Sequence, residues 1–525
     1  LLKEIREDDI VWIHDYHLFL LPQLIREKFP QISIGFFLHI PFPSYEVFRL
    51  LPWRIQILEG ILGADLIGFH TYDYQRHFLS ATRRLLGYDA HLNQISVEHR
   101  DVKIDAFPMG IDYDRFHDMA MQVSKNSEKR RSRIKKTVMD ATGKQSERKL
   151  ILSMDRLDYS KGIPARLQAF ERFLERNKRY HEKVSMFLLA VPSRTNVDQY
   201  RELKSTVDEM VGRINGNFGT IDWMPIRYFY RSLPFDQIVE LYVHSDIALV
   251  TPLRDGMNLI AKEFLVSKTD SQGVLILSEM AGSVKELGEA IIVNPNDINN
   301  MAESIEEALR ISKERQIKGN EIMRKRLRRY DVTRWANEFM KTLTETKELQ
   351  QKMLSKKMND NIIEEMANAY KKAKNRLILL DYDGTMIPFN REYYKSKPDK
   401  EIMNILENLS KDEKTCTVVI SGRDKDTLED WFGKLPLCKI AEHGVWIKDK
   451  TGKWEMIEPL SNAWKDEIRT VLERFVDRTP GSAIEEKNYS LVWHYRKADQ
   501  GMGLIRAREM KDELTTLLAN LNVEI

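Results

Sequence analysis

The amino-acid sequence predicts an α/β fold with several parallel sheets, on two observations. Short apolar runs alternate with amphipathic helical segments along most of the chain, which is typical of strand–helix–strand units in parallel sheets. The chain has 525 residues and 42% of them are hydrophobic, so it can form two to four domains with sizeable cores.

Composition excludes several classes of protein. A net charge of +3 does not by itself indicate a nucleic-acid partner, and no apolar run is long enough to span a membrane. The two cysteines, Cys416 and Cys438, exclude a disulfide framework and indicate a reducing cytosol, so we expect a cytoplasmic protein. Because the chain starts at Leu1 without Met and ends at Ile525 inside an expected strand, we expect it to be cut at both ends.

The first part of the chain, residues 1–125, alternates strands and helices. Apolar runs predict strands, and amphipathic segments predict helices between them. The strands are expected at residues 10–13, 34–38 and 64–69, and the helices at 18–29 and 72–86. The basic stretch 124–149 is interpreted as a solvated surface helix, with an anion-binding face as the alternative.

A second α/β unit is expected over residues 126–345. Its strands are predicted at 149–153, 185–190, 247–250 and 274–277, and a closing helix at 331–345. Two such Rossmann-like halves in series predict a cleft between them, where a nucleotide and an acceptor meet. The polar, lysine-rich segment 346–374 is interpreted as a helical linker.

A third unit begins at about Asn375. The apolar run Leu377–Leu380 leads directly into Asp381-Tyr382-Asp383-Gly384-Thr385. A strand that ends in two carboxylates and a glycine turn suits a nucleophilic aspartate, a second aspartate as general acid/base, and a bound divalent cation. The alternative is a strand end with two solvated aspartates. We expect a core over residues 375–460 and a cap over 461–525.

Four segments carry the chemistry of the first two units, and each follows an expected strand. They are residues 12–17 (WIHDYH), 39–43 (HIPFP), 155–162 (DRLDYSKG) and 253–263 (LRDGMNLIAKE). Together these segments resemble the trehalose-6-phosphate synthases, which are retaining glycosyltransferases of the GT-B type. The resemblance covers most of residues 1–345 and implies a GT-B pair of Rossmann-like domains, with an incomplete N-terminal one.

Charge placement agrees with this resemblance. Arg156 and Lys161 can stabilise a leaving diphosphate without a metal. Gly256 allows backbone amides to approach an anion, and the residues after it are expected to open a helix whose N-terminus favours phosphate. Arg156 and Lys161 as plain surface charges are the alternative. His14 and His17 have metal-ligand spacing, but strand-end packing is the preferred interpretation.

The resemblance assigns further roles to matching residues. It implies that Asp255 holds the donor glucose, Glu263 the donor ribose and Arg194 the acceptor phosphate. Asp15 would meet the acceptor sugar, and His39 would lie beside the donor glucose. The remaining donor-side positions are Gly256, Met257, Asn258 and Leu259. The implied reaction is glucosyl transfer from UDP-glucose to glucose 6-phosphate with retention, without a cofactor.

Residues from Asn375 onward resemble the trehalose-6-phosphate phosphatases of the HAD superfamily. The resemblance implies that Asp381 is phosphorylated and that Asp383 is the general acid/base. Mg²⁺ would be held by Asp381 and by the main chain at Asp383. A second strand ends in Ser421-Gly422-Arg423, whose hydroxyl can bind the phosphoryl group. The cap residues assigned to the phosphosugar are Glu485, Lys487, His494 and Arg496, which otherwise read as a solvated strand.

We therefore expect a bifunctional enzyme that makes trehalose 6-phosphate and dephosphorylates it to trehalose. One alternative is a regulatory sugar-phosphate-binding protein with one or both sites inactive. The other is a sucrose-phosphate enzyme pair, against which HDYH and RDGMNLIAKE argue. Expected elements are missing at both ends: a Gly-rich loop with its arginine, and a later lysine and acidic motif. The donor nucleotide (UDP, GDP or ADP) and a homo-oligomeric state stay open, and neither nucleic acid nor a membrane is expected as a partner.

Overall fold

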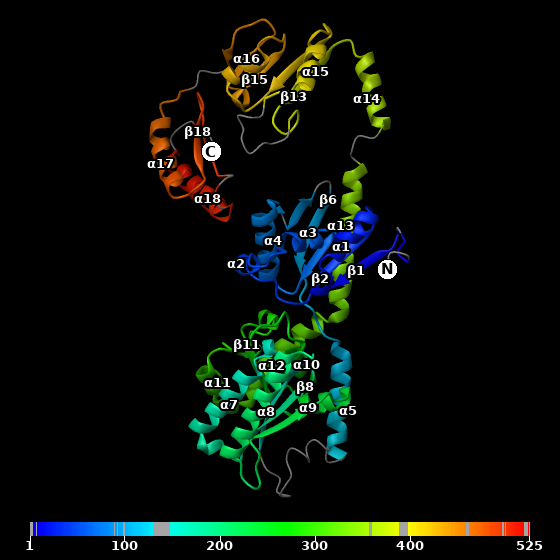
Figure 1. Cartoon of the computed structure of the whole chain (residues 1–525), viewed down its shortest axis with the longest axis vertical. Coiled ribbons are helices and arrows are strands. Elements are labelled where there is room, and N and C mark those ends of the chain that lie inside the picture. The colour runs from blue at the N-terminus through cyan, green and yellow to red at the C-terminus, as the bar shows by residue number, and fades with distance from the viewer. Residues whose placement is uncertain are drawn as a thin grey trace. The chain divides into compact units, whose positions relative to one another are not determined.

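The structure is a computed structural model and consists of two compact units (Figure 1). It describes residues 4–6, 8–88, 90–91, 93–97, 100–129, 148–194, 196–355, 360–387, 397–457, 461–495, 498, 500–518 and 523. The first unit spans Leu1–Lys352 and the second Met353–Ile525. Each unit is described by itself.

The N-terminal half of the first unit has a six-stranded sheet in the order β1-β2-β3-β6-β5-β4. Four neighbouring strands are parallel, namely β1 (Ile10–His14), β2 (Ser33–Leu38), β3 (Leu66–Phe69) and β6 (Arg100–Ala106). β5 (Gln94–Val97) and β4 (Ala90–His91) extend the sheet as an antiparallel edge. Its helices are α1 (Leu21–Lys28), α2 (Tyr45–Phe48), α3 (Arg54–Leu62) and α4 (Tyr72–Leu86). The predicted strands and helices of this half are confirmed.

The C-terminal half has a fully parallel sheet in the order β12-β11-β10-β7-β8-β9. Its strands are β7 (Lys149–Arg156), β8 (Val184–Val191), β9 (Ile226–Tyr230), β10 (Ile247–Val250), β11 (Val274–Ser278) and β12 (Ile291–Val293). Its helices are α5 (Tyr113–Lys129), α7 (Ile163–Arg176), α8 (Asp198–Phe218), α9 (Phe235–His244), α10 (Leu259–Ser267), α11 (Ile298–Arg310) and α12 (Lys313–Arg329). Two apolar clusters cover the two faces, as strands without polar alternation require. Most of the basic stretch 124–149 lies outside the described residues.

Helix α13 (Val332–Ser355) returns the chain to the N-terminal half. Its Phe339 lies so close to β2 and β3 that a Cβ on Gly35 or Gly68 would meet the ring at 2.7 or 2.8 Å. The predicted linker 346–374 needs correction, because α13 continues through its first ten residues. Gln350 is buried and donates to Asp65 Oδ1 at 3.1 Å, so this part of the segment packs on the first unit.

The second unit begins with α14 (Asp360–Lys372) and contains a sheet in the order β13-β14-β15-β16-β17. Its first three strands are parallel, namely β13 (Arg376–Asp381), β14 (Thr415–Ile420) and β15 (Cys438–Ala441). β16 (Trp446–Lys448) and β17 (Glu455–Met456) are antiparallel, and the helices are α15 (Lys400–Ser410) and α16 (Lys425–Phe432).

The predicted cap has an apolar core of its own, separate from that of this sheet. It consists of α17 (Lys465–Asp477), the hairpin β18 (Ala483–Glu486) and β19 (Leu491–His494), and α18 (Gln500–Leu517). Across the described residues of both units, no helix combines the length and the apolar character needed to cross a membrane.

Candidate active sites

Two cationic side chains follow the carboxyl end of β7. Arg156 is the last residue of the strand and is exposed, and no ion pair is recorded for it within the described chain. Lys161 ends the short turn after it, and its Nζ lies 2.5 Å from Asp255 Oδ2. The turn requires Gly162, because φ is +66° and a Cβ would meet the carbonyl of Thr251 at 2.7 Å. Arg156 thus ends the strand and Lys161 ends the turn that follows it; their shared role toward a diphosphate stays a prediction.

Asp255 connects this turn to the start of α10. Its Oδ2 accepts hydrogen bonds from Lys161 and from Asn258 Nδ2, the latter at 3.0 Å. Asn258 has φ +66° and caps the helix by accepting from the amide of Ala261 at 3.2 Å. The N-terminus of α10, with Leu259 as its first residue, therefore lies beside the cations and favours a phosphate there. Met257 is buried.

Gly256 lies where the backbones of the two halves of the unit approach each other closely. A Cβ here would lie 1.9 Å from the carbonyl oxygen of His39, at the end of β2. The sequence predicts that this glycine allows the close approach of an anion. The structure supplies a different requirement, because the backbone of the N-terminal half occupies the place of a side chain.

Glu263 has a partner that the sequence did not reveal. The hydroxyl of Tyr242, on α9, donates to Glu263 Oε2 at 2.6 Å, and Tyr242 is fully buried. Burial raises the pKa of Glu263, and the hydrogen bond from Tyr242 lowers it. One carboxylate oxygen is thereby held in place. In the sequence Tyr242 reads only as an apolar position of a helix, and no motif marks it.

The N-terminal half contributes Asp15 and three histidines. Asp15 has φ +72° directly after β1, and its Oδ1 accepts from the amide of His39 at 3.3 Å. His14 Nδ1 and His39 Nε2 lie 3.0 Å apart, so one donates to the other. Burial lowers the pKa of His39, and nearby His14 lowers it further. His70 is 3% exposed beside this pair and was missed by the sequence analysis.

His14 thus bonds another histidine, and His17 is exposed. Among the residues that the structure describes, no group of three or more His, Cys, Asp or Glu side chains is placed to hold a metal ion.

Arg194 connects the two halves of the first unit. It follows β8 with φ +46°, and its guanidinium donates to Tyr200 at 3.0 Å and to Tyr16 at 2.9 Å. Tyr16 is the neighbour of Asp15. The structure therefore brings Arg194 to the hydroxyl of Tyr16, although 178 residues separate the two in the sequence.

In the second unit, the two aspartates stand at the carboxyl end of β13. Asp381 Oδ2 accepts from the hydroxyl of Thr385 at 2.8 Å. Both oxygens of Asp383 accept from Arg423, at 2.6 and 2.9 Å. Arg423 was assigned to the substrate, so this ion pair is a finding of the structure. Ser421 is 2% exposed, and its Oγ accepts from the amide of Arg423 at 3.1 Å.

The cap approaches the same edge of the sheet. Lys487 Nζ donates to the carbonyl of Gly422 at 2.7 Å, and Asn488 donates to Glu442 at 3.2 Å. Glu485 accepts from His494 at 2.6 Å. Arg496 lies outside the described residues. Three of the four predicted cap residues are thus placed, and Lys487 contacts the Ser421–Arg423 loop directly.

The donors near Asp381 are compatible with Mg²⁺. The Asp381 carboxylate and the carbonyl of Asp383 are hard oxygen ligands of the kind that this ion prefers, with water completing the shell. This fit rests on the chemistry of the donors.

Comparison with known proteins divides the chain into two parts, as the two compact units of the structure do. Residues 1–345 match glycosyltransferase family 20, and residues 379–525 match the trehalose-phosphatase family. A protein of Thermoproteus tenax named bifunctional trehalose-6-phosphate synthase/phosphatase is 42% identical over 524 residues, which cover 99% of this chain and 70% of that protein. Alpha,alpha-trehalose-phosphate synthase [UDP-forming] A of Dictyostelium discoideum is 41% identical, over 98% of this chain and 69% of that one.

Solved structures resemble the first unit. The UDP-forming alpha,alpha-trehalose-phosphate synthase of Burkholderia xenovorans is 36% identical with a TM-score of 0.62, over 66% of this chain and 76% of that chain. Another structure of a synthase from that organism is a complex with glucose-6-phosphate, with the same identity and TM-score over 66% of this chain and 75% of that one. The predicted GT-B architecture is confirmed.

Proposed function

The chain belongs to glycosyltransferase family 20 and continues into a trehalose-phosphatase domain, and we propose that it makes trehalose in two steps. The first unit transfers glucose from UDP-glucose to glucose 6-phosphate. The second hydrolyses the trehalose 6-phosphate formed. The observation that carries the first step is the pair of Lys161 and Asp255 beside the N-terminus of α10, with Arg156 at the end of the strand that leads to Lys161.

In the first step, negative charge grows on the diphosphate as it leaves. Arg156, Lys161 and the amides that open α10 stabilise this charge. Asp255 holds hydroxyls of the donor glucose, and Glu263 holds the ribose. A hydroxyl of the acceptor attacks the anomeric carbon from the face that UDP leaves. The bond to UDP breaks, and the leaving phosphate takes the proton of the hydroxyl, so the configuration is retained.

Acceptor binding uses groups from both halves. Arg194 would hold the phosphate of glucose 6-phosphate, and Asp15 would orient the sugar, with His39 beside the donor glucose. In the present arrangement Arg194 donates to Tyr16 and Tyr200. We propose that an incoming phosphate replaces these two hydroxyls, because a charge-assisted pair is stronger than a bond to a neutral hydroxyl.

In the second step, the Asp381 carboxylate attacks phosphorus and forms an aspartyl phosphate. Asp383 gives a proton to the leaving sugar oxygen and then removes one from the attacking water. Both carboxylate oxygens of Asp383 accept hydrogen bonds from Arg423. We propose that Arg423 moves to the incoming phosphoryl group and leaves the Asp383 carboxyl group free to face the sugar oxygen. Mg²⁺, held by Asp381 and the Asp383 carbonyl, would supply charge stabilisation when bound.

Cap residues complete the proposed phosphosugar site. Lys487 and Glu485 lie nearest the Ser421–Arg423 loop, and His494 bonds Glu485. A cytoplasmic location stays a proposal, supported by Cys416 and Cys438 being free thiols. UDP is the proposed nucleotide because the relatives are named UDP-forming.

The test is a coupled assay of the protein and its Asp381→Asn variant. UDP release is measured with UDP-glucose, GDP-glucose or ADP-glucose plus glucose 6-phosphate, and trehalose and phosphate are measured with Mg²⁺. An amide cannot form the aspartyl phosphate, so the variant should accumulate trehalose 6-phosphate at the wild-type rate of UDP release. Absence of both turnovers, with sugar phosphates still bound, would favour the regulatory alternative.

A further inference from the structure

A cavity of about 650 Å³ opens at the amino-terminal edge of the second sheet. Its lining includes the first residues of β7, β10 and β11, together with the ends of α9, α10 and α11 and the start of α12. The proposed donor site lies at the other edge of the same sheet. β7 begins at Lys149 in the cavity and ends at Arg156, which at 3.3 Å per residue places them roughly 23 Å apart. A ligand here would not overlap the nucleotide.

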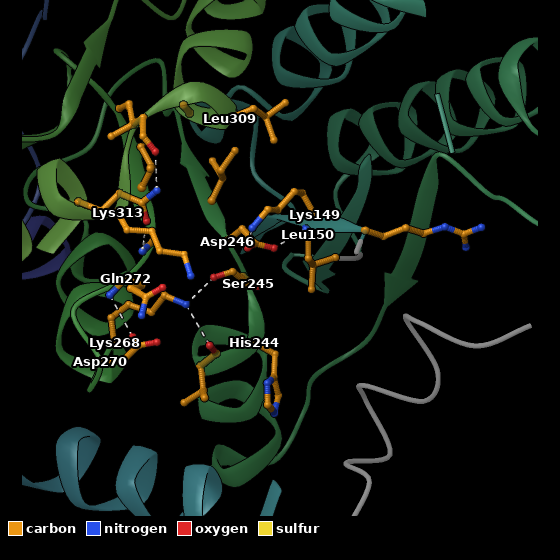
Figure 2. Close-up of a pocket in the computed structure, with 18 of the residues that line it drawn as sticks. Lys149, Leu150, His244, Ser245, Asp246, Lys268, Asp270, Gln272, Leu309 and Lys313 are labelled. Atoms are coloured by element: carbon orange, nitrogen blue, oxygen red, sulfur yellow. Dashed lines mark hydrogen bonds and ion pairs between the residues drawn. The ribbon is translucent and has the colours of Figure 1, made fainter. Parts of the chain in front are cut away.

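Three lysines from three elements surround this cavity (Figure 2). Lys149 and Lys313 are exposed at its rim, and Lys268 is 5% exposed at its floor. Asp246 pairs with Lys149 at 2.7 Å, and Asp270 is the second carboxylate of the lining. The cavity therefore keeps a net positive charge. The guanidinium of Arg148, also in the lining, is directed to the carbonyls of Glu182 and Asp222 instead.

Lys268 differs from the other two lysines because its side chain is buried. Its ammonium donates to the carbonyls of Val243 (2.9 Å) and Ser245 (2.5 Å) at the end of α9, and among the described residues no acceptor is recorded for its third N–H. Burial lowers the pKa of Lys268 to about 8. A buried charge of this kind is stabilised by an opposite charge, and Asp270 and Asp246 supply only part of it.

Lys313 is a second cation of the cavity, and unlike Lys268 it has no recorded partner among the described residues. It is the first residue of α12, and no hydrogen bond or ion pair is recorded for its amine in the part of the chain that the structure describes. In Figure 2 its side chain and that of Lys268 reach into the cavity from different elements. An anion between them would be bound by two ammonium groups and enclosed by the cavity walls. The volume is in the range of small-molecule sites.

We infer that this cavity binds a small phosphate-bearing molecule between Lys268 and Lys313, at the edge of the sheet opposite to the proposed donor site. The inference does not depend on the proposed reactions. The cavity also touches the ends of α9 and α10, the helices that carry Tyr242 and Glu263.

The test is calorimetric titration of the intact protein with inorganic pyrophosphate. Saturating UDP fills the donor site, and EDTA keeps the phosphatase free of magnesium. Lys313→Glu should weaken binding about tenfold or more, because it replaces a charge-assisted contact with repulsion. Lys318→Glu, on the exposed side of the same helix and outside the cavity lining, makes the same change of net charge and should leave the affinity unchanged. Absence of saturable binding, or equal loss in both variants, would overturn the inference.

A second measurement avoids variants that disturb the fold. Brief treatment of the wild-type protein with cyanate at pH 8 carbamylates neutral amines, and peptide mass spectrometry gives the initial rate at each lysine. Pyrophosphate should slow modification of Lys268 and Lys313 and leave Lys318 unaffected. If pyrophosphate left the modification rates of Lys268 and Lys313 unchanged, that result would contradict the proposed site.

Discussion

At the scale of single residues, the donor site depends on charges held in fixed positions. Lys161 is paired with Asp255 at 2.5 Å, and both side chains are only 14% exposed. If the diphosphate binds here as proposed, such a pair does not have to reorganise when it arrives, because its charges are already in position.

We expect Lys161→Ala to lower the rate of UDP release about a hundredfold, which corresponds to roughly 3 kcal/mol of lost transition-state stabilisation. Phosphate release from trehalose 6-phosphate should not change. Steady-state assays of both reactions measure this, with Lys178→Ala, an exposed lysine of the same half, as the control. An unchanged rate of UDP release would show that Lys161 only forms an ion pair with Asp255 and does not stabilise the leaving diphosphate.

Tyr242 tests the assignment of Glu263 to the nucleotide. Tyr242→Phe removes the 2.6 Å hydrogen bond and should raise KM for UDP-glucose about tenfold, with a smaller change in kcat. The KM for glucose 6-phosphate should stay constant. Tyr180→Phe, at a half-buried tyrosine of the same half, is the control. Equal rises in both KM values would indicate a general loss of structure.

The same variant makes a prediction about pH. The hydrogen bond from Tyr242 lowers the pKa of Glu263, so its removal raises that pKa further above the usual value. Since the ionised carboxylate is the acceptor for ribose hydroxyls, binding of UDP-glucose should be lost at a higher pH on acidification than in the wild type. A profile of kcat/KM against pH measures the shift, and an unmoved acidic limb would exclude Glu263 as the titrating group.

At the scale of elements, α13 packs on the sheet of the N-terminal half and completes the core of that half. Phe339 is fully buried on β2 and β3, where Gly35 and Gly68 leave room for its ring. The helix thus stabilises the ends of the strands that carry His39 and His70.

Phe339→Ala should lower the free energy of unfolding of the first unit by about 3–5 kcal/mol, because it leaves a cavity between helix and sheet. The loss is measured by unfolding the protein in denaturant, with UDP binding as the signal for the folded first unit. Lys341→Ala, whose side chain is 77% exposed on the same helix, should have little effect. Equal stability of the two variants would mean that α13 is not essential to the core.

At the scale of the whole molecule, separate cores predict separate unfolding. Among the residues that the structure describes, no hydrophobic cluster contains members of both units. Phe432→Ala, at a fully buried residue of the phosphatase core, should lower the inactivation temperature of phosphate release by about ten degrees or more. The inactivation temperature of UDP release should not move. Residual activities after heating give both values, and a joint shift would show that the units unfold together.

Much of the fold followed from the sequence alone. Continuous apolar runs predict buried parallel strands, and the helix expected at residues 72–86 is observed as Tyr72–Leu86. Local periodicity is sufficient here because each strand or helix needs only an apolar face of the right period. The same local patterns predict that Lys161, Asp255, Asp381 and Asp383 lie at or after the ends of strands, where the structure has them. Their roles stay predictions.

Tertiary structure decided the pairings between distant residues. The hydrogen bond of Tyr242 to Glu263, the ion pair of Arg423 with Asp383 and the approach of His39 to Gly256 have no local signal. The end of α13 was predicted as linker because its polar residues satisfy Asp65 and Asp101 of the first half, and their polarity reads as exposure in the sequence. A residue type states what a side chain can bind, and only the packing of elements far apart in the chain determines which partner it meets.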